Sequence, residues 1–443
     1  MAEIKVSVVI PVYNSEKFLT QTLDSVCRQT LTDIEILCVD DGSIDSGPEI
    51  LERYAKQDPR IRLFHLKDSA PGAADARNKG LEEARGRYLS FLDADDLFDP
   101  DLLKKAYERA EKTGADAVLY DARSFDSASG EFTDVGTYIL FDKLPEKETF
   151  RASDYRDCFF QAESGAAWCG LYRRSFVLEH GLRFKAHHHT DDLYFTYTAL
   201  LSAERITALS DKLLYYRDNN ESSQTATRMT DPLAAPAAWK ELQAWMQKNQ
   251  CYEPFKVSFV NKALEYCRWY LEQSRDYQAF ETLWNDLHGG SLEILWPDDV
   301  GKDDFYDVSL FDWAQDIRNS DFPAFLFDRL QKTNDRLFAY DPRFGFPMDL
   351  VQTDDHVVLY GAGEVGRRYF TENLRCGYCQ IVAWVDKHYE KAGFPVTSPD
   401  TLRDISFDKV LICASSDGAA ESIEKDLRAA GVEETCIINQ RTY

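Results

Sequence analysis

The chain has 443 residues, a length that predicts two to four domains rather than one core. Hydrophobic residues make up 44% of it and charged residues 29%, which is ordinary for a soluble globular protein. The formal net charge of −25 argues against a nucleic-acid partner and against electrostatic docking on anionic lipid, because both need clustered Lys and Arg.

The first part of the chain alternates predicted strands with predicted helices, which is typical of a largely parallel α/β sheet covered on both faces. The strands are expected at residues 4–12, 34–39, 61–66, 87–92 and 116–121. The helices are expected from Asn14-Ser15 onward, near 46–56, and at 72–85 and 100–113. In the first helix, the apolar residues that share one face are Phe18, Leu19, Leu23 and Val26.

Residues 122–230 are less regular, and short strands with loops are expected there. Asp231-Pro232 marks a boundary, after which aromatic and Leu side chains at helical spacing predict a helical segment. A new α/β unit begins near residue 350, with strands expected at 357–360, 381–385, 409–414 and 436–438. The predicted domains are therefore 1–230, 231–348 and 349–443.

The sequence holds no apolar stretch near the roughly 20 residues that span a bilayer. Its first residues, Met1 to Lys5, lead directly into a predicted strand and lack the layout of a signal peptide. We therefore expect a cytoplasmic protein with at most peripheral membrane association. The sequence leaves open whether the chain forms a homo-oligomer.

Polar groups stand where three predicted strands of the N-terminal region end. The strands run into Tyr13-Asn14, into Asp40-Asp41 and into Asp93-Ala94-Asp95-Asp96. Ligands of open α/β sheets bind at the carboxyl ends of the strands. The three ends therefore predict one acidic rim that suits a divalent cation and a nucleotide.

These segments and the run from Gly72 to Gly80, which contains Ala76-Arg77-Asn78, resemble the family 2 glycosyltransferases of the GT-A fold in order and spacing. The resemblance implies a mixed, largely parallel GT-A-type α/β sheet flanked by helices. In this chain, a helical region and a small Rossmann-like α/β domain would follow it. The implied activity is a metal-dependent, inverting transfer of a sugar from a nucleotide-diphosphate sugar to an acceptor hydroxyl, in bacterial polysaccharide or glycoconjugate synthesis.

The resemblance also implies which residues bind the nucleoside. Pro11, Tyr13 and Asn14 match the first loop of the family, in which the aromatic residue flanks the base. Asp41 matches the acid that reaches a pyrimidine ring. Simple packing is the alternative for Tyr13, and a helix-capping turn is the alternative for the Asp40-Asp41 pair.

The same resemblance implies which residues bind the metal ion and the diphosphate. Asp95 is expected to bind Mg²⁺ or Mn²⁺, and Asp93 to contact the ribose or the metal shell. Arg77 is expected to meet phosphate or to order the aspartates, with a solvated helix face as its alternative. Arg217 is expected to brace the leaving group, and the polar stretch 218–227 to cover the donor.

The catalytic base is expected in Thr190-Asp191-Asp192, which opens a predicted helix. The resemblance puts Asp192 at the base position, with Asp191 in place of the usual Glu, so that the sequence leaves open which of the two is the base. Capping of the helix by two acids is the alternative. The preceding histidines, 187–189, are candidates for a metal ligand, an acceptor contact or a polar loop.

The C-terminal region carries a glycine motif after a predicted strand and before a predicted helix. Its members are Gly361, Gly363 and Gly366, and Asp386 stands twenty residues beyond the last glycine. The region resembles small Rossmann-like modules that bind sugar nucleotides or NAD. A regulatory nucleotide or NAD site, a structural or dimerising module, and independent redox catalysis all remain open.

The partners implied are a nucleotide-diphosphate sugar and a glycan or lipid-linked glycan, without nucleic acid. The alternative function is a catalytically silent sugar-nucleotide-binding scaffold or regulatory protein. A nucleotidyltransferase would open with a glycine-rich loop after its first strand, whereas this chain has Pro11-Val12-Tyr13-Asn14. An oxidoreductase function would be supported by the C-terminal glycine motif alone.

Overall fold

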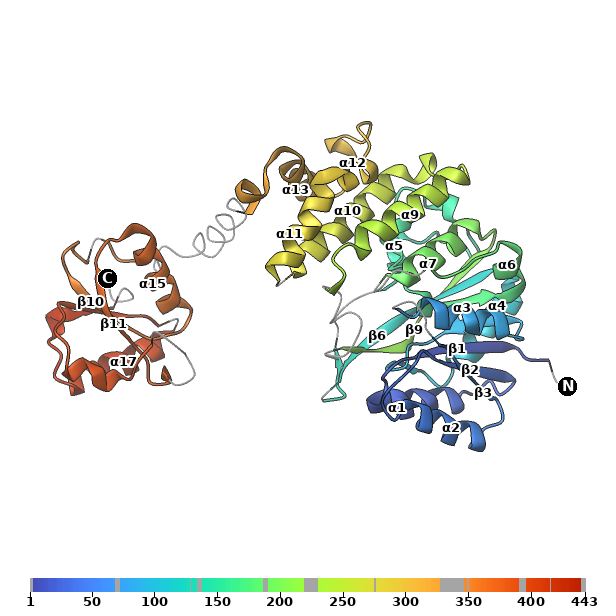
Figure 1. The fold of residues 1–443 in the computed structure, drawn as a ribbon, viewed down its shortest axis with the longest axis horizontal. Coiled ribbons are helices and arrows are strands. Elements are labelled where there is room, and N and C mark those ends of the chain that lie inside the picture. Colours follow the sequence, from blue (N-terminus) through green and yellow to red (C-terminus); the bar gives the residue numbers. More distant parts are fainter. Residues whose placement is uncertain are drawn as a thin grey trace. The chain divides into compact units, whose positions relative to one another are not determined.

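The structure, a computed structural model, divides into two compact units, Met1–Phe322 and Pro323–Tyr443, and each is described by itself (Figure 1). The residues described are 3–67, 72–127, 129–133, 138–185, 190–218, 230–274, 276–326, 346–348, 350–389, 396–414 and 416–439. The division into residues 1–230, 231–348 and 349–443 stays a prediction.

Within the described residues, the N-terminal unit holds a nine-stranded sheet of order β3-β2-β1-β4-β8-β6-β9-β5, with β7 beside β6. The strands are β1 (Val6–Val12), β2 (Ile34–Asp40), β3 (Ile61–His65), β4 (Tyr88–Phe91), β5 (Leu97–Phe98), β6 (Ala117–Asp126), β7 (Phe132–Thr133), β8 (Gly170–Arg173) and β9 (Ile206–Asp218). Strands β1 to β4 pair in parallel, whereas β8 and β5 run antiparallel to their neighbours. The mixed, largely parallel α/β sheet is therefore confirmed.

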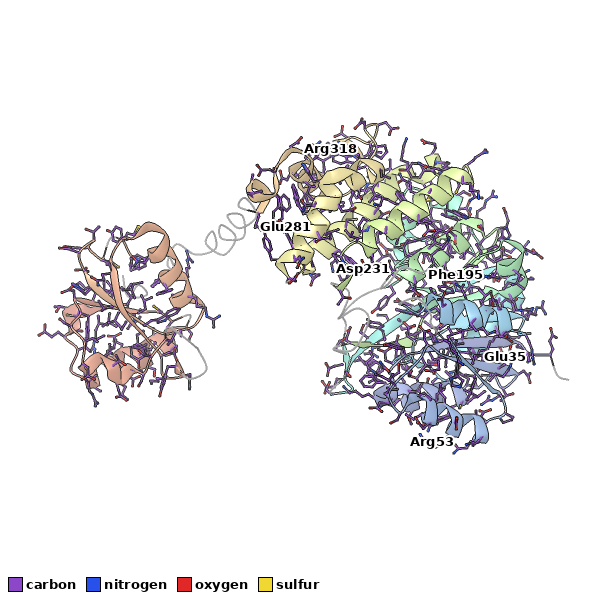
Figure 2. The ribbon with its side chains drawn as sticks, in the orientation of Figure 1. Glu35, Arg53, Phe195, Asp231, Glu281 and Arg318 are labelled. Atoms are coloured by element: carbon purple, nitrogen blue, oxygen red, sulfur yellow. The ribbon has the colours of Figure 1, made fainter. Side chains whose placement is uncertain are left out.

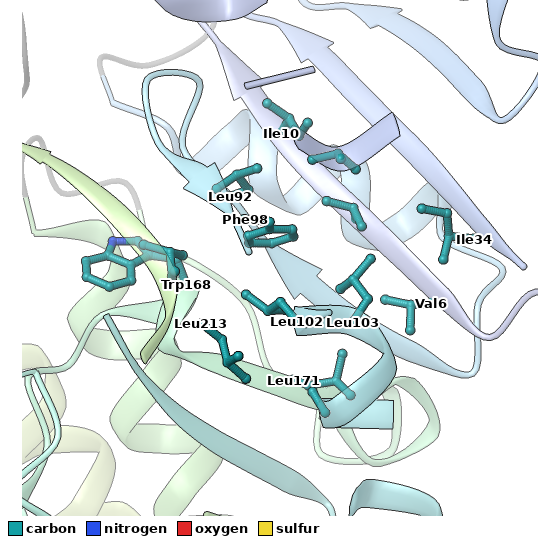
Figure 3. Packing of buried hydrophobic residues seen from close by; sticks show 14 of the residues in the cluster. Val6, Ile10, Ile34, Leu92, Phe98, Leu102, Leu103, Trp168, Leu171 and Leu213 are labelled. Atoms are coloured by element: carbon teal, nitrogen blue, oxygen red, sulfur yellow. The ribbon is translucent and has the colours of Figure 1, made fainter. Parts of the chain in front are cut away.

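Helices cover both faces of this sheet, and the residues of its central strands β1, β2 and β4 are buried. All seven residues of β1 are buried, as expected for a strand covered on both faces. The helices after the first strands are α1 (Glu16–Cys27), α2 (Gly47–Gln57), α3 (Ala74–Glu83) and α4 (Leu102–Thr113). The predicted buried face of α1 is confirmed. Figure 3 shows part of the core between the sheet and the helices, which includes Val6 of β1 and Leu102 and Leu103 of α4.

The segment 122–230 is more regular than predicted. It contains α5 (Phe159–Ala162), α6 (Arg174–Glu179), the twelve-residue helix α7 (Asp191–Ser202) and the thirteen-residue strand β9. β9 pairs in parallel with β6 from Ala117 to Asp126, and the register shifts between Tyr120 and Ala122. This irregular pairing keeps polar residues of β9 exposed, which weakens the strand pattern in the sequence.

The helical segment packs on the same unit. Its helices are α9 (Ala234–Lys248), α10 (Lys256–Gln273), α11 (Tyr277–Asp286), α12 (Leu292–Leu295) and α13 (Val308–Asn319). Rings of Trp239 and Phe259 contact Phe160 of α5, and Trp239 also contacts Tyr197 of α7. The aromatic stripe of this segment is therefore core. In the part of the chain that the structure describes, no helix combines the length and the apolar character needed to cross a bilayer.

The C-terminal unit has, over its described residues, a four-stranded parallel sheet of order β11-β10-β12-β13. Its elements are β10 (His356–Tyr360), α15 (Glu364–Cys376), β11 (Gln380–Val385), β12 (Lys409–Ile412), α17 (Asp417–Ala429) and β13 (Ile437–Ile438). Successive residues of β10 enter different cores: Val357 lies in one apolar cluster and Val358 in another. Both faces of the sheet are thus covered, and four of the predicted strands are confirmed.

Candidate active site

Three loops of the N-terminal unit meet at one edge of the sheet. Strands β2, β1 and β4 are neighbours and run parallel, so that the loops after Asp40, Val12 and Phe91 emerge on the same side. This juxtaposition is the acidic rim that the strand ends predicted. It lies at the position where open α/β sheets bind ligands.

Asn14 joins the first two of these loops. Its backbone N–H donates to Oγ of Ser43 at 3.0 Å, and its Oδ1 accepts from the N–H of Ile44 at 2.9 Å. The residue has a φ of 45°, in the left-handed region that non-glycine residues rarely adopt. The structure shows that Asn14 holds the two loops together, and its predicted contact with a nucleotide stays a prediction.

The other residues predicted for the nucleoside differ in accessibility. Tyr13 is 62% exposed beside this junction, so that its ring is available to a ligand. The N–H of Asp41 donates to the carbonyl of Val12 at 2.8 Å, which places Asp41 next to the first loop. Pro11 is buried inside β1. A direct nucleotide contact by any of these residues stays a prediction.

Arg77 of α3 lies at the centre of a carboxylate cluster, which we call the Arg77 clamp. Its Nη2 lies 2.6 Å from Oδ1 of Asp93, and its Nη1 lies 2.7 Å from Oδ1 of Asp192 and also pairs with Asp191. The guanidinium is only 4% exposed, and the ring of Phe184 covers it with its centroid 5.5 Å away. The clamp therefore connects the end of β4 with the start of α7, segments that are far apart in the sequence.

Burial and the neighbouring charges shift the pKa values of Arg77, Asp191 and Asp192. Burial would lower the pKa of Arg77, but the neighbouring aspartates together raise it above its ordinary value, so that the cation is permanent. Burial raises the pKa of Asp191 and of Asp192, and Arg77 opposes this shift. Asp192 is the more accessible of the two, with 20% of its side chain exposed against 4% for Asp191. Its Oδ2 also accepts from the N–H of Ala167 at 3.3 Å.

Arg217 braces the turn that follows β4. Its Nε donates to the carbonyl of Asp95 at 2.7 Å, and its N–H donates to Oδ1 of Asp96 at 2.8 Å. Its Nη2 donates to Gln21 of α1 at 2.8 Å, and the rings of Phe18 and Phe125 flank it. Arg217 therefore fixes the backbone of the predicted metal-binding segment, and its contact with a leaving group stays a prediction.

Asp96 is a site residue that the sequence reasoning did not select. Its side chain is 1% exposed, and Oδ2 has no hydrogen-bond partner within the described residues. Burial, followed by the charges of Asp95 and Asp93, raises the pKa of Asp96 well above its usual range. A third acid directly after Asp93-Ala94-Asp95 was the available signal, because an Asp side chain is rarely fully buried unless it is paired.

The aspartates that follow β4 show how well the site fits a divalent cation. Asp93 and Asp95 offer the carboxylate oxygens that Mg²⁺ and Mn²⁺ prefer, whereas Asp96 is buried, with 1% of its surface exposed. Over the described ranges, no group of three or more His, Cys, Asp and Glu is arranged to hold a metal ion. Mg²⁺ typically binds through one or two carboxylates together with substrate phosphates. The rim therefore fits an ion that binds with a nucleotide better than a resident ion.

Two further sequence predictions fall outside this description. The histidines 187–189, which were candidates for a metal or acceptor contact, lie outside the described residues, as does most of the predicted cover at 218–227.

The glycine motif of the C-terminal unit is tightly packed. A Cβ on Gly361 would lie 2.5 Å from the carbonyl oxygen of Cys413, and one on Gly366 would lie 1.9 Å from the carbonyl oxygen of Gly361. At Gly363, by contrast, a Cβ would meet no atom within 4 Å among the described residues. Packing thus requires the first and third glycines, whereas the second faces open space.

Asp386 stands beside this motif but is used by the backbone. Its Oδ2 accepts from the N–H of Ala362 at 2.6 Å, and its Oδ1 accepts from the N–H of His388 at 2.7 Å. The indole of Trp384 donates to the carbonyl of Gly361 at 2.9 Å. These bonds stabilise the turn whether or not a ligand binds.

Comparison with known proteins gives matches for both units. Residues 7–181 match the family described as "Glycosyl transferase family 2", and residues 353–438 match the one described as "C2185-like, N-terminal". The chain is 30% identical over 256 residues to "Putative glycosyltransferase EpsH" of Bacillus subtilis, an alignment that covers 57% of this chain and 72% of EpsH. It is 32% identical over 267 residues to "Uncharacterized glycosyltransferase EpsJ" of Bacillus subtilis, which covers 58% of this chain and 70% of EpsJ.

Staphylococcus aureus TarS, a poly(ribitol-phosphate) β-N-acetylglucosaminyltransferase, is 27% identical over 241 residues, or 52% of this chain and 38% of TarS. The crystal structure of S. aureus TarS 1–349 in complex with UDP-GlcNAc superposes with a TM-score of 0.55 and 21% identity. The superposition covers 66% of this chain and 82% of that one. The GT-A fold of the N-terminal unit is thereby confirmed.

Proposed function

The chain belongs to glycosyltransferase family 2 and is a nucleotide-sugar-dependent glycosyltransferase, and we propose that it transfers the sugar to a hydroxyl of a glycan or lipid-linked glycan. The setting we propose is the synthesis of a bacterial polysaccharide or glycoconjugate. The activity of its relative TarS, transfer of N-acetylglucosamine to poly(ribitol-phosphate), supports this setting.

The observation that carries the proposal is the Arg77 clamp. A transferase must hold a donor and a proton acceptor at fixed separation, because correct orientation supplies much of the rate enhancement. Arg77 joins Asp93, at the predicted donor side, to Asp192, at the predicted base position. A sheet protein that merely bound a nucleotide would have no need for the second half of the clamp.

In the proposed mechanism, Asp192 accepts the proton of the acceptor hydroxyl as that oxygen attacks the anomeric carbon. The bond from this carbon to the diphosphate oxygen breaks on the opposite side, and a single direct displacement inverts the configuration. Asp192 is the better base because it is more exposed than Asp191, while a raised pKa increases its proton affinity. Asp191 holds Arg77 and thereby positions Asp192.

The donor is proposed to be a uridine diphosphate sugar, with its base beside Tyr13 and Asp41. The exposure of Tyr13 and the UDP-GlcNAc complex of TarS support this choice. Asp95 would hold Mg²⁺ or Mn²⁺, with Asp93 near the ribose or the metal shell. The cation would neutralise charge on the leaving diphosphate. The bonds of Arg217 to Asp95 and Asp96 keep this segment in place.

Calorimetric titration tests the donor site directly. Nucleoside diphosphates and NAD are titrated into the full chain with and without Mn²⁺, and then into Asp95→Ala. We expect UDP to bind in a Mn²⁺-dependent manner and the variant to lose that dependence. Asp142→Ala, which removes an exposed acid from a short helix elsewhere on the unit, serves as the matched control. Equal binding of UDP to both variants would place the donor site elsewhere.

Turnover separates this function from the alternative of a silent scaffold. A panel of UDP-sugars is incubated with the chain, and the release of UDP is followed. A scaffold would bind UDP without releasing it from any donor. If the wild type releases UDP and Asp192→Asn does not, the scaffold function is excluded.

For the C-terminal unit we propose a Rossmann-like module whose glycine turn is maintained first by packing. The close contacts at Gly361 and Gly366 support this role. A nucleotide or NAD site would have Gly363 as the point of closest backbone approach, because a side chain there would meet open space. The titration with NAD tests this second site. Binding of NAD that is the same in the wild type and in Asp95→Ala would support a site in the C-terminal unit.

A further inference from the structure

Helix α1 carries a buried hydroxyl on a face that is otherwise apolar. Leu19, Leu23 and Val26 of this helix belong to the apolar core, and side chains fill the space between the helix and the sheet (Figure 2). Thr22 lies on the same face, with 0% of its surface exposed. A buried hydroxyl costs free energy unless it is hydrogen-bonded, so that the position of Thr22 depends on the bond that it makes.

Thr22 reaches the turn that contains the predicted metal ligand. Its Oγ1 donates to the carbonyl of Ala94 at 2.9 Å, and this bond joins residues that are 72 positions apart in the sequence. A threonine in the middle of a helix commonly bonds a carbonyl of its own helix instead. The hydroxyl of Thr22 is therefore used for the segment Asp93-Ala94-Asp95.

The carbonyl of Ala94 belongs to the peptide unit that leads into Asp95. Because a peptide unit is planar, a hydrogen bond to this carbonyl restrains the whole plane before Asp95. The plane after Asp95 is held in the same way, since Nε of Arg217 donates to the carbonyl of Asp95 at 2.7 Å. The backbone has two soft torsion angles per residue, and the two planes together determine both of them. Thr22 and Arg217 thus restrain the direction of the Cα–Cβ bond of Asp95.

Other polar side chains of α1 hold the chain beyond this turn. Oγ of Ser25 accepts from the N–H of Phe98 at 3.2 Å. Nε2 of Gln29 donates to the carbonyl of Asp99 at 2.7 Å. These bonds anchor β5 and the residue after it, whereas the bond of Thr22 anchors the turn with the aspartates.

We propose that Thr22 is a positioning residue for the metal-assisted binding of the donor. It acts through the peptide plane before Asp95 and holds that carboxylate at the predicted metal site. A cation that binds through one or two carboxylates depends strongly on the placement of each, and Mg²⁺ requires near-ideal octahedral geometry. The inference rests on the proposed function, because it takes Asp95 as the metal ligand and a uridine diphosphate sugar as the donor.

Calorimetric titration of UDP into the full chain at several Mn²⁺ concentrations tests the proposal. Thr22→Val keeps the shape of the side chain and removes the hydroxyl, so that the carbonyl of Ala94 loses its donor. We expect the affinity for UDP at limiting Mn²⁺ to fall by about 3–10-fold, the effect of one hydrogen bond. The affinity without Mn²⁺ should equal that of the wild type. Saturating Mn²⁺ should restore the affinity, because excess metal compensates for a weakened ligand by mass action.

Two further variants separate this role from general packing. Thr22→Ser keeps the hydroxyl and should depend on Mn²⁺ as the wild type does. Thr30→Val is the matched control, since it makes the same chemical change at an exposed threonine, whose Oγ1 donates to Oδ1 of Asp101 at 2.7 Å, outside the turn. Its affinity for UDP should match that of the wild type at every Mn²⁺ concentration.

Three results would overturn the inference. They are an unchanged affinity of Thr22→Val at limiting Mn²⁺, an equal loss with and without the metal, and a loss in Thr22→Ser as large as that in Thr22→Val. The last two would indicate that Thr22 acts in packing only. If binding of UDP by the wild type does not depend on Mn²⁺, the proposed metal site itself is contradicted, and the role of Thr22 with it.

Discussion

Nη1 of Arg77 lies 2.7 Å from Oδ1 of Asp192, although the two residues are more than a hundred positions apart in the sequence. The same cation pairs with Asp93 and Asp191, so that the charge state of the proposed base depends on a buried group. Changes to either residue should therefore have distinct consequences for catalysis and for stability.

Replacement of the proposed base should affect turnover far more than donor binding. Asp192→Asn removes the proton acceptor and keeps the side-chain shape, and we expect kcat to fall by about 10²–10⁴-fold. Asp191→Asn, the matched variant, should lose less activity because the base remains. UDP release and calorimetric UDP binding are measured for both. A larger loss of kcat in Asp191→Asn than in Asp192→Asn would exchange the two roles.

Removal of the buried cation should destabilise the N-terminal unit. Arg77→Met leaves Asp93, Asp191 and Asp192 close together without a counter-charge, which typically costs about 3–5 kcal/mol. Urea denaturation of the full chain measures this loss. Arg87→Met removes a half-exposed partner of Glu111 and should change the free energy of unfolding by about 0–1 kcal/mol. Equal effects of the two variants would show that the clamp does not support the fold.

Much of the fold could be predicted because its signals are local. Apolar strands ending in polar residues predicted β1, β2 and β4 and the shared edge where their loops meet. The partners of Arg77 could not be predicted, because they come from segments whose distance in space depends on the order of the strands. Arg77 was expected at the phosphates or among the aspartates; it pairs with the aspartates, and a phosphate contact stays a prediction.

The importance of Asp96 was missed for a related reason. Its role depends on burial and on the N–H of Arg217, a residue of β9 that is more than a hundred positions away in the sequence. The sequence shows three acids in four positions but not which carboxyl points inward. Burial of one acid in such a cluster follows from tertiary packing.

The strained backbone of Asn14 gives a prediction for nucleotide binding. Asn14→Gly keeps the left-handed conformation and loses the bond to Ile44, so that UDP binding should weaken by about 3–10-fold, the effect of one hydrogen bond. Asn14→Ala should weaken binding further, because alanine adds a backbone cost of about 1–2 kcal/mol. Calorimetric titration with UDP measures both.

Gln250→Gly is the control for Asn14, since Gln250 also has a positive φ, of 57°, but lies after α9 and away from the rim. Its affinity for UDP should equal that of the wild type. Affinities of Asn14→Gly and Asn14→Ala that also equal the wild type would show that the loop junction does not shape the donor site.

Glu163 should make stability depend on pH. Burial raises the pKa of Glu163 to about 8, so that the folded chain binds its proton more tightly than the unfolded chain does. Glu163 contributes to the free energy of unfolding, and this contribution is fully present below about pH 4.3, the pKa of Glu in the unfolded chain. It is lost as the pH rises through about 8, at up to about 1.4 kcal/mol per pH unit. Glu163→Gln should lose less stability over this range. Parallel urea-denaturation curves for the two proteins against pH would contradict the assignment.

The glycine turn of the C-terminal unit offers a matched pair of substitutions that separates packing from ligand binding. In Gly366→Ala the new methyl group meets the carbonyl oxygen of Gly361, and the backbone must move, so that peptides covering β10 should exchange hydrogen for deuterium much faster. In Gly363→Ala the methyl group enters open space, and exchange should match that of the wild type.

If the unit binds NAD or another nucleotide through this turn, Gly363→Ala should weaken that binding without unfolding the strand, since the methyl group would occupy the space of the phosphate. Unchanged nucleotide binding in Gly363→Ala would leave packing as the role of the motif, and rapid exchange in that variant would show that the open space at residue 363 is needed by the fold itself.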